Sequence, residues 1–212
     1  MGLRGITLLI ASSTAFAAMS QGLMHDIRAA LGEEPLPIVK LDLRGSFISN
    51  ERVQFAGIKF GLEHSARFQY GIGYSFLWSR VENVETVPVD GAVTTRLRFG
   101  YVTPYAECAF YRKGPWELRM PVQFGFGSGS VVYDDAVGRT RKLQKSGVFL
   151  YEPSITVQYR FLKYFGLGAG WGYRLVLRSA PLAEGLTAPI YTFGLKVFFG
   201  DLSKDIRGVG QE

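Results

Sequence analysis

The sequence predicts an all-β protein, an eight-stranded antiparallel up-and-down transmembrane β-barrel with a polar interior. Between Phe68 and Trp78 every second residue is large and apolar, and the residues between them are mostly small or polar. A period of two is typical of a β-strand, because successive side chains point to opposite faces. The pattern recurs along the chain, with glycine and charge opposite the apolar face. An apolar outside and a polar inside are typical of a membrane barrel.

The N-terminal residues predict export. An apolar stretch from Gly5 to Ala18 follows Arg4 and leads into small residues, which is the layout of a secretory signal peptide over residues 1–20. Cleavage after Ala17 and cleavage after Ser20 both fit. The stretch is too short for a transmembrane helix, and a buried N-terminal helix is the alternative. The chain has 212 residues, so we expect one further domain after the signal peptide.

Residues 21–37 are expected to form a periplasmic segment before the barrel. Leu23, Ile27 and Leu31 recur every four residues until Gly32 and Pro35. This spacing fits a short amphipathic helix lying against the inner leaflet of the outer membrane. A disordered leader in the mature protein fits equally well.

The barrel is expected over residues 38–199, with strands at about 38–48, 52–62, 67–78, 94–110, 116–127, 148–160, 165–176 and 190–199. Six of these alternate cleanly, with apolar faces running through Val39–Phe47, Phe68–Trp78, Trp116–Phe126, Tyr151–Tyr159, Phe165–Tyr173 and Tyr191–Phe199. The seventh strand is the clearest, because glycines and Arg174 make up its other face.

Two strands change phase. In the second, the change falls between Phe55 and Ala56. In the fourth, Leu97, Phe99 and Tyr101 share one parity, whereas Ala106, Cys108 and Phe110 share the other. A β-bulge near Pro104 would restore the register, turn Glu107 inward and leave Cys108 facing lipid.

Glycine on the polar faces indicates which side is outside. A soluble lipocalin-like barrel also alternates, but its exposed faces would carry polar side chains, because glycine weakens a strand. The interior of an eight-stranded barrel is just wide enough for side chains to fill it. Glycines on some strands would then make room for arginines from others, which favours an apolar outside.

Connection lengths support the same topology. We expect short links at 63–66, 112–115 and 161–164, a tight first link at Ser49–Glu51, and long polar links at 79–93, 130–147 and 177–189. Membrane barrels keep short turns in the periplasm and long loops outside. Both termini would then be periplasmic, with residues 200–212 as a short periplasmic tail.

The last strand carries a resemblance to a known class. Thr192, Gly194, Val197 and Phe199 fit a polar-x-Gly-x-x-apolar-x-aromatic pattern, which resembles the assembly signal that outer-membrane barrels present to their insertion machinery. Phe199 departs from that signal because it is not terminal. The chain from Ile38 to Phe199 resembles small OmpA/OmpX-type barrels, and Leu162–Arg174 resembles the outer-membrane barrel family common in Bacteroidota. These resemblances imply the barrel-assembly machinery as a partner and no catalytic motif.

Inward charges form the strongest candidate site. On the predicted inner faces lie Lys40, Asp42, Arg44, Lys59, Arg96, Arg98, Glu107, Glu117, Arg119, Glu152, Arg160, Arg174 and Lys196. A pore lining is one interpretation. A packed network of ion pairs that fixes strand register is the favoured one, because eight strands leave no wide channel.

Little else predicts chemistry. Cys108 is the single cysteine, so no intramolecular disulfide or multi-cysteine metal site can form, and no cofactor is expected. Barrel enzymes that modify lipid resemble one another in using a histidine near the outer rim. Here the two histidines, His25 and His64, fall before the barrel and in a short periplasmic turn. An outer-leaflet lipid-modifying enzyme is therefore the less favoured alternative.

The long link around Tyr133–Ser146 contains Asp134, Asp135, Arg139, Arg141, Lys142 and Lys145. Its basic half would meet lipopolysaccharide phosphates or an acidic partner, or would simply be solvated. Aromatic girdles are expected at Trp78, Tyr101, Trp116, Tyr159 and Trp171. The formal charge of +6 is spread along the chain, so we expect no nucleic-acid partner.

These observations predict a monomeric outer-membrane protein with a structural or surface-interaction role and no catalysis. A small channel and an accessory component of a secretion or gliding machine are further alternatives.

Overall fold

A computed structural model of the chain describes residues 24–25, 27–48, 51–87, 91–135, 137–179 and 186–209. The predicted signal peptide at 1–20 lies outside the described residues. So do Leu23, the tight link at 49–50 and residues 180–185 of the last long connection. Residues 24–25 and 27–31 are helical, with Ala30 buried and Leu31 exposed.

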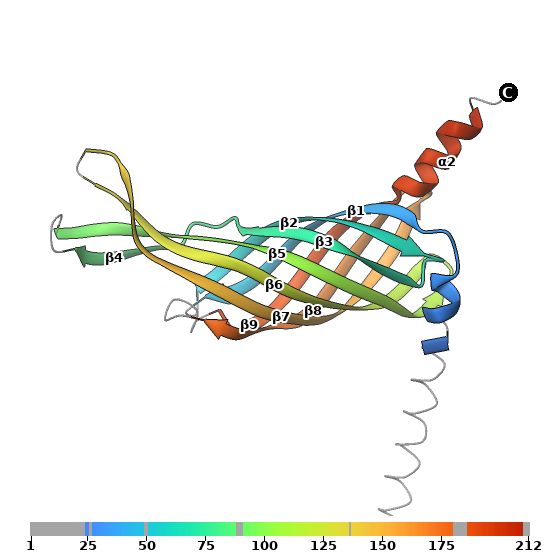
Figure 1. The fold of residues 1–212 in the computed structure, drawn as a ribbon, viewed down its shortest axis with the longest axis horizontal. Coiled ribbons are helices and arrows are strands. Elements are labelled where there is room, and N and C mark those ends of the chain that lie inside the picture. Colours follow the sequence, from blue (N-terminus) through green and yellow to red (C-terminus); the bar gives the residue numbers. More distant parts are fainter. Residues whose placement is uncertain are drawn as a thin grey trace, which may run out of the picture.

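Eight strands close into an antiparallel ring, which confirms the predicted fold class (Figure 1). The barrel strands are β1 (Leu36–Ile48), β2 (Glu51–His64), β3 (Phe68–Leu77), β5 (Gly91–Lys113), β6 (Trp116–Asp134), β7 (Thr140–Leu162), β8 (Phe165–Ser179) and β9 (Ala188–Val197). Each strand pairs with its neighbour, and β9 pairs back to β1. A ninth strand, β4 (Glu82–Val87), pairs with β5 outside the ring.

The two faces of the wall differ as predicted for a membrane barrel. Large apolar side chains point outward, among them Ile72 and Phe193 at 54% and 63% exposure. Charged side chains point inward, and Arg119, Glu152 and Arg174 have no exposed surface. Glycine makes room for them: a Cβ added to Gly73 would lie 2.6 Å from Cγ of Lys59. The interior is therefore filled by side chains, as expected for eight strands.

The expected phase changes are wrong. Along β2, Val53, Phe55 and Lys59 all point inward, so the strand keeps one register. The β3–β5 ladder runs without interruption past Pro104, and no bulge occurs there. The irregularity of β5 lies instead between Ala109 and Tyr111, against β6. The apparent phase changes have one physical cause: apolar residues face the lumen near one end of the barrel.

Three strands continue far beyond the ring. β5 and β7 have 23 residues each and β6 has 19, whereas the other barrel strands have 10 to 15. Their extensions, together with β4, form a four-stranded sheet that projects from one end of the barrel (Figure 1). We call this sheet, residues 82–98 and 128–147, the arm. The links predicted at 79–93 and 130–147 are thus largely strand and not loop.

The opposite end carries the short turns and both described chain ends (Figure 1). The expected tail contains a helix, α2 (Phe199–Val209), which begins two residues after β9 ends. Asp201 of α2 forms an ion pair with Arg160 of β7, and Asp205 bonds to Lys163 and Tyr164 in the β7–β8 turn. Among the described residues, no helix has the length and apolar character needed to cross a membrane.

Candidate functional site

One buried carboxylate organises the middle of the lumen. Glu152 accepts hydrogen bonds from Arg44 Nη1 at 2.7 Å and from Arg174 Nε at 2.5 Å. It also accepts bonds from the hydroxyl of Tyr101 at 3.3 Å and from the amide of Gln123. Arg44 in turn donates to Ser75. These six residues come from six different strands, so the cluster ties most of the ring together.

A second cluster fills the lumen toward the end with the short turns. Glu63 pairs with Arg119 at 2.6 Å and with Lys196 at 2.5 Å. The remaining pairs are Arg119–Glu117 at 2.7 Å, Lys40–Glu107 at 2.6 Å and Lys59–Asp42 at 2.7 Å. Each of these carboxylates has a cationic partner within ion-pair distance. Such pairing is what allows charges to be buried, because an unpaired charge in the interior is very costly.

Three residues of the predicted network lie elsewhere. Arg96 and Arg98 occupy the outward parity of β5, since Phe99 and Tyr101 point inward, and Arg96 pairs with Asp134 on the arm. Arg160 lies at the rim, where it pairs with Asp201 and donates to the carbonyl of Lys163. The other predicted members lie inside the barrel, including Asp42 and Glu107, which pair with Lys59 and Lys40. Sequence reasoning missed Glu63, because it was expected in the short link at 63–66, whereas the structure places it on β2 facing the lumen.

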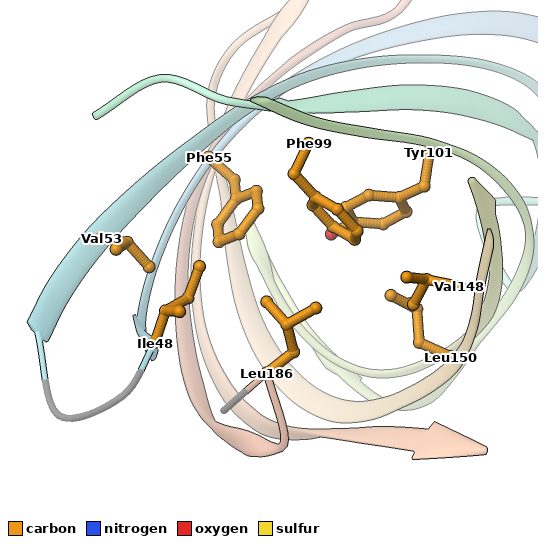
Figure 2. Packing of buried hydrophobic residues seen from close by; sticks show 8 residues of the cluster. All are labelled: Ile48, Val53, Phe55, Phe99, Tyr101, Val148, Leu150 and Leu186. Carbon is orange, nitrogen blue, oxygen red and sulfur yellow. The ribbon is translucent and has the colours of Figure 1, made fainter. Parts of the chain in front are cut away.

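An apolar layer fills the lumen on the arm side of Glu152. It comprises Ile48, Val53, Phe55, Phe99, Tyr101, Val148, Leu150 and Leu186. Figure 2 shows these side chains pointing inward from the wall. Phe55 packs edge-on against Phe99 at 6.0 Å, and Arg174 lies 4.3 Å from the Phe55 ring centroid. The layer therefore rests directly on the charge cluster. The prediction of Tyr101 as a girdle residue is therefore wrong, because its side chain is buried at 1% exposure.

Little space remains between the packed side chains. A cavity of about 50 Å³ lies between the two charge clusters, lined by Asp42, Lys59, Thr192, Lys196 and their neighbours. This volume suits about one or two water molecules. The lumen is therefore filled by an apolar layer on the arm side and by ion pairs toward the short turns.

The histidines do not approach the arm. His64 is buried at 5% exposure at the short-turn end, where Nδ1 lies 3.0 Å from the carbonyl oxygen of Glu33 and the ring stacks on Tyr70. It therefore holds the segment before β1 against the barrel. The prediction that His64 lies in a turn is wrong, because it is the last residue of β2. His25 lies in the segment before β1 and is exposed.

The basic residues of the expected loop are on the arm. Asp135 accepts bonds from the backbone amides of Val137 and Arg139 and from Arg141 Nε at 2.9 Å, which shapes the β6–β7 turn. These bonds lower the pKa of Asp135, the backbone bond from Arg139 contributing most. Lys142 and Lys145 are exposed on β7. From Thr140 to Gly147, β7 pairs with β6 and not with β8.

The residues of the predicted assembly signal divide between two elements. Thr192 and Gly194 line the lumen cavity, and Val197 is the last residue of β9. Phe199 begins α2, and the aromatic side chain that packs at the strand end is Phe198, 5% exposed and under Arg160 and Lys196. Their role in assembly stays a prediction.

Comparisons with known proteins show the fold. No family model matches the chain, and no curated protein matches it. A solved structure of neisserial surface protein A matches with a TM-score of 0.55 and 15% identity over 76% of this chain and 96% of that one. Ail, the attachment invasion locus protein of Yersinia pestis, gives 0.49 and 12% over 77% and 98%. The N-terminal barrel domain of Pseudomonas aeruginosa OprF gives 0.41 and 11% over 77% and 98%.

These neighbours are small outer-membrane β-barrels. At 15% identity the similarity to neisserial surface protein A shows a shared fold. The neighbours give no support to the resemblance of Leu162–Arg174 to the Bacteroidota family.

Proposed function

We propose that this chain is a non-enzymatic outer-membrane protein whose barrel is a membrane anchor and whose arm is its contact surface outside the cell. The arm carries the proposal: strands β5, β6 and β7 continue past a filled barrel as one paired sheet. Long loops of such barrels lie on the extracellular side, so both chain ends would be periplasmic. All edges of the ring are paired, which fits a monomer.

The filled lumen supports anchoring over transport. A channel needs a continuous polar path, and here the apolar layer at Phe55 and Leu150 and the ion pairs at Glu152 occupy it. Buried His64 at the short-turn end and exposed His25 before β1 likewise give no support to an outer-rim enzyme. An accessory role in a larger envelope machine is compatible with the same contact surface.

Photo-cross-linking in living cells tests the interaction role. A photoreactive residue replaces Val84 or Val137, which are 68% and 78% exposed on the arm, and Ile155, 55% exposed on the lipid face, is the control. We expect adducts with other macromolecules at Val84 or Val137 and lipid adducts alone at Ile155. If both arm positions behave like Ile155, the arm is not a contact surface.

The enzyme alternative has its own test. His25→Ala and His64→Ala are introduced together, and the acylation of lipid A is compared by mass spectrometry in otherwise identical strains. We expect identical acyl patterns with and without the two histidines. A changed pattern would establish a lipid-modifying activity and contradict the proposal.

A further inference from the structure

The outward side chains at the base of the arm form parallel rows across neighbouring strands. The first row is apolar, with Tyr74, Val102, Phe126 and Phe149 in register. The second row consists of small residues except for Phe76 at its edge, and its other members are Gly100, Ser128 and Gly147. The third is basic at both ends, with Arg98, Ser130 and Lys145. The surface thus changes from apolar to basic within three rows, with a strip of small residues between them.

The strip of small residues is hollowed. An open groove of about 440 Å³ is lined by Tyr74 and Phe76 on its apolar side and by Arg98, Ser128 and Ser130 on its polar side. Gly100 forms part of its floor, and the Tyr74 hydroxyl would lie 2.6 Å from a Cβ added there. Gly100 has no side chain and Ser128 beside it has a small one, which keeps the floor of the groove low. Gly147, paired with Ser128 on the next strand, has open space where a Cβ would lie.

Arg98 lines the groove, Lys145 lies in the same row two strands away, and both cations are available for a ligand. Arg96, one row farther out, already pairs with Asp134. Among the described residues, neither Arg98 nor Lys145 forms an ion pair or a side-chain hydrogen bond. Two free cations and two serine hydroxyls beside exposed aromatic rings suit a ligand with both an anionic and an apolar part.

We propose that this groove binds a phosphorylated, acylated glycolipid of the outer leaflet. Its phosphate would accept hydrogen bonds from Arg98, Lys145 and the serine hydroxyls, and its acyl chains would lie along Tyr74, Phe76 and Phe126. The groove is continuous with the lipid-facing wall, so a lipid reaches it without leaving the membrane. The proposal rests on an outer-membrane location with the arm outside, but not on the arm having a macromolecular partner.

Titration of the full-length protein tests the site. The barrel is folded in neutral detergent and titrated with hexa-acylated bisphosphoryl lipid A, its dephosphorylated form, phosphatidylglycerol and inorganic phosphate, and bound copies are counted by native mass spectrometry. We expect bisphosphoryl lipid A to bind roughly tenfold more tightly than the other three, because the site uses phosphate and acyl chains together.

The variant R98Q/K145Q removes the two cations. We expect its affinity for bisphosphoryl lipid A to fall roughly 10-fold to 30-fold, the effect of two basic residues that face anionic lipid. The control R28Q/K113Q removes the same charge at two exposed positions outside the groove and the arm, and it should leave the affinity within about threefold. S128W fills the groove and keeps the cations, and it should weaken binding as much as R98Q/K145Q does.

Heat-modifiable migration on a detergent gel shows that each variant is folded before titration. Equal affinity for the dephosphorylated lipid or for phosphatidylglycerol would overturn the proposal of a phosphoglycolipid site. Binding of inorganic phosphate alone would show an anion site without lipid selectivity. An equal loss in R28Q/K113Q would show that net charge, and not the groove, attracts the lipid.

Discussion

Glu152 on β7 and Arg174 on β8 form an ion pair of 2.5 Å in which neither side chain is exposed to solvent. Arg44 approaches the other carboxylate oxygen at 2.7 Å, so one carboxylate serves two buried arginines. Burying these charges costs much of what their attraction provides. Loss of Glu152 alone would therefore destabilise the ring, although the cluster as a whole adds little to the free energy of unfolding.

Replacing Glu152 by Gln should destabilise the barrel by about 3–5 kcal/mol, because two buried guanidinium groups lose their anionic partner. The free energy of unfolding is measured in detergent by urea titration, followed by tryptophan fluorescence. The control is Glu85→Gln on exposed β4, which should change that free energy by less than about 0.5 kcal/mol. Similar small effects for both variants would show that the cluster is not a stabilising element.

Phe55 tests the apolar layer. Phe55→Ala should cost about 3–5 kcal/mol, because it opens a cavity between Phe99 and Arg174. Phe60→Ala, five residues along the same strand and 53% exposed, should cost clearly less, since lipid or detergent fills the space. The same urea titration measures both. A larger loss at Phe60 would place the lumen on the other face of β2.

Phe55 faces the lumen and Phe60 faces outward on the same strand, and this difference shows what the sequence alone could predict. Alternation established the strands and their order, and glycine opposite the aromatic residues of β8 indicated the inner face. Alternation cannot tell inside from outside where the lumen is itself apolar, however. Alternation therefore predicts Tyr101 at the lipid face and Arg96 and Arg98 in the lumen, whereas the structure places them on the opposite faces.

The arm and α2 escaped prediction for a different reason. The sequence of β4, from Glu82 to Val87, is polar and short, and its strand state depends on pairing with β5. The extension of β6 and β7 depends on the pairing between these two strands and on the hydrogen bonds that Asp135 accepts in the turn. Both are tertiary contacts, which the local sequence pattern does not reveal. In the same way, α2 is held by Arg160 and Lys163, which precede it by about forty residues.

Acid should loosen α2 from the barrel. Hydrogen bonds from Lys163 and Tyr164 lower the pKa of Asp205 from its ordinary value near 3.8. A lowered pKa means that these bonds stabilise docking fully above that ordinary value and are lost as the pH falls through the lowered pKa. Amide hydrogen exchange, corrected for its intrinsic pH dependence, should show α2 protected at pH 7 and less protected near pH 2.

Asp205→Asn provides the control for that measurement. It should lower the protection of α2 at pH 7 and reduce the further loss on acidification, because the titrating carboxylate is gone. Residual protection is expected from Asp201, which still pairs with Arg160. If the wild-type protein and D205N respond to acid equally, Asp205 does not hold the helix.

The lumen should carry no steady current in planar bilayers, because the apolar layer and the Glu152 cluster close it in series. Removing the cluster and the centre of the apolar layer together, as R44A/F55A/L150A/E152A/R174A, takes away five fully buried side chains without leaving a partner charge unpaired, and it should produce small stepwise conductances. E82A/E85A/R139A on the arm is the matched control and should stay closed, because these residues lie outside the ring. A steady current through the wild-type protein would instead identify a channel. It would also show that the layer around Phe55 opens, since no ion crosses an apolar seal of that kind while it remains packed.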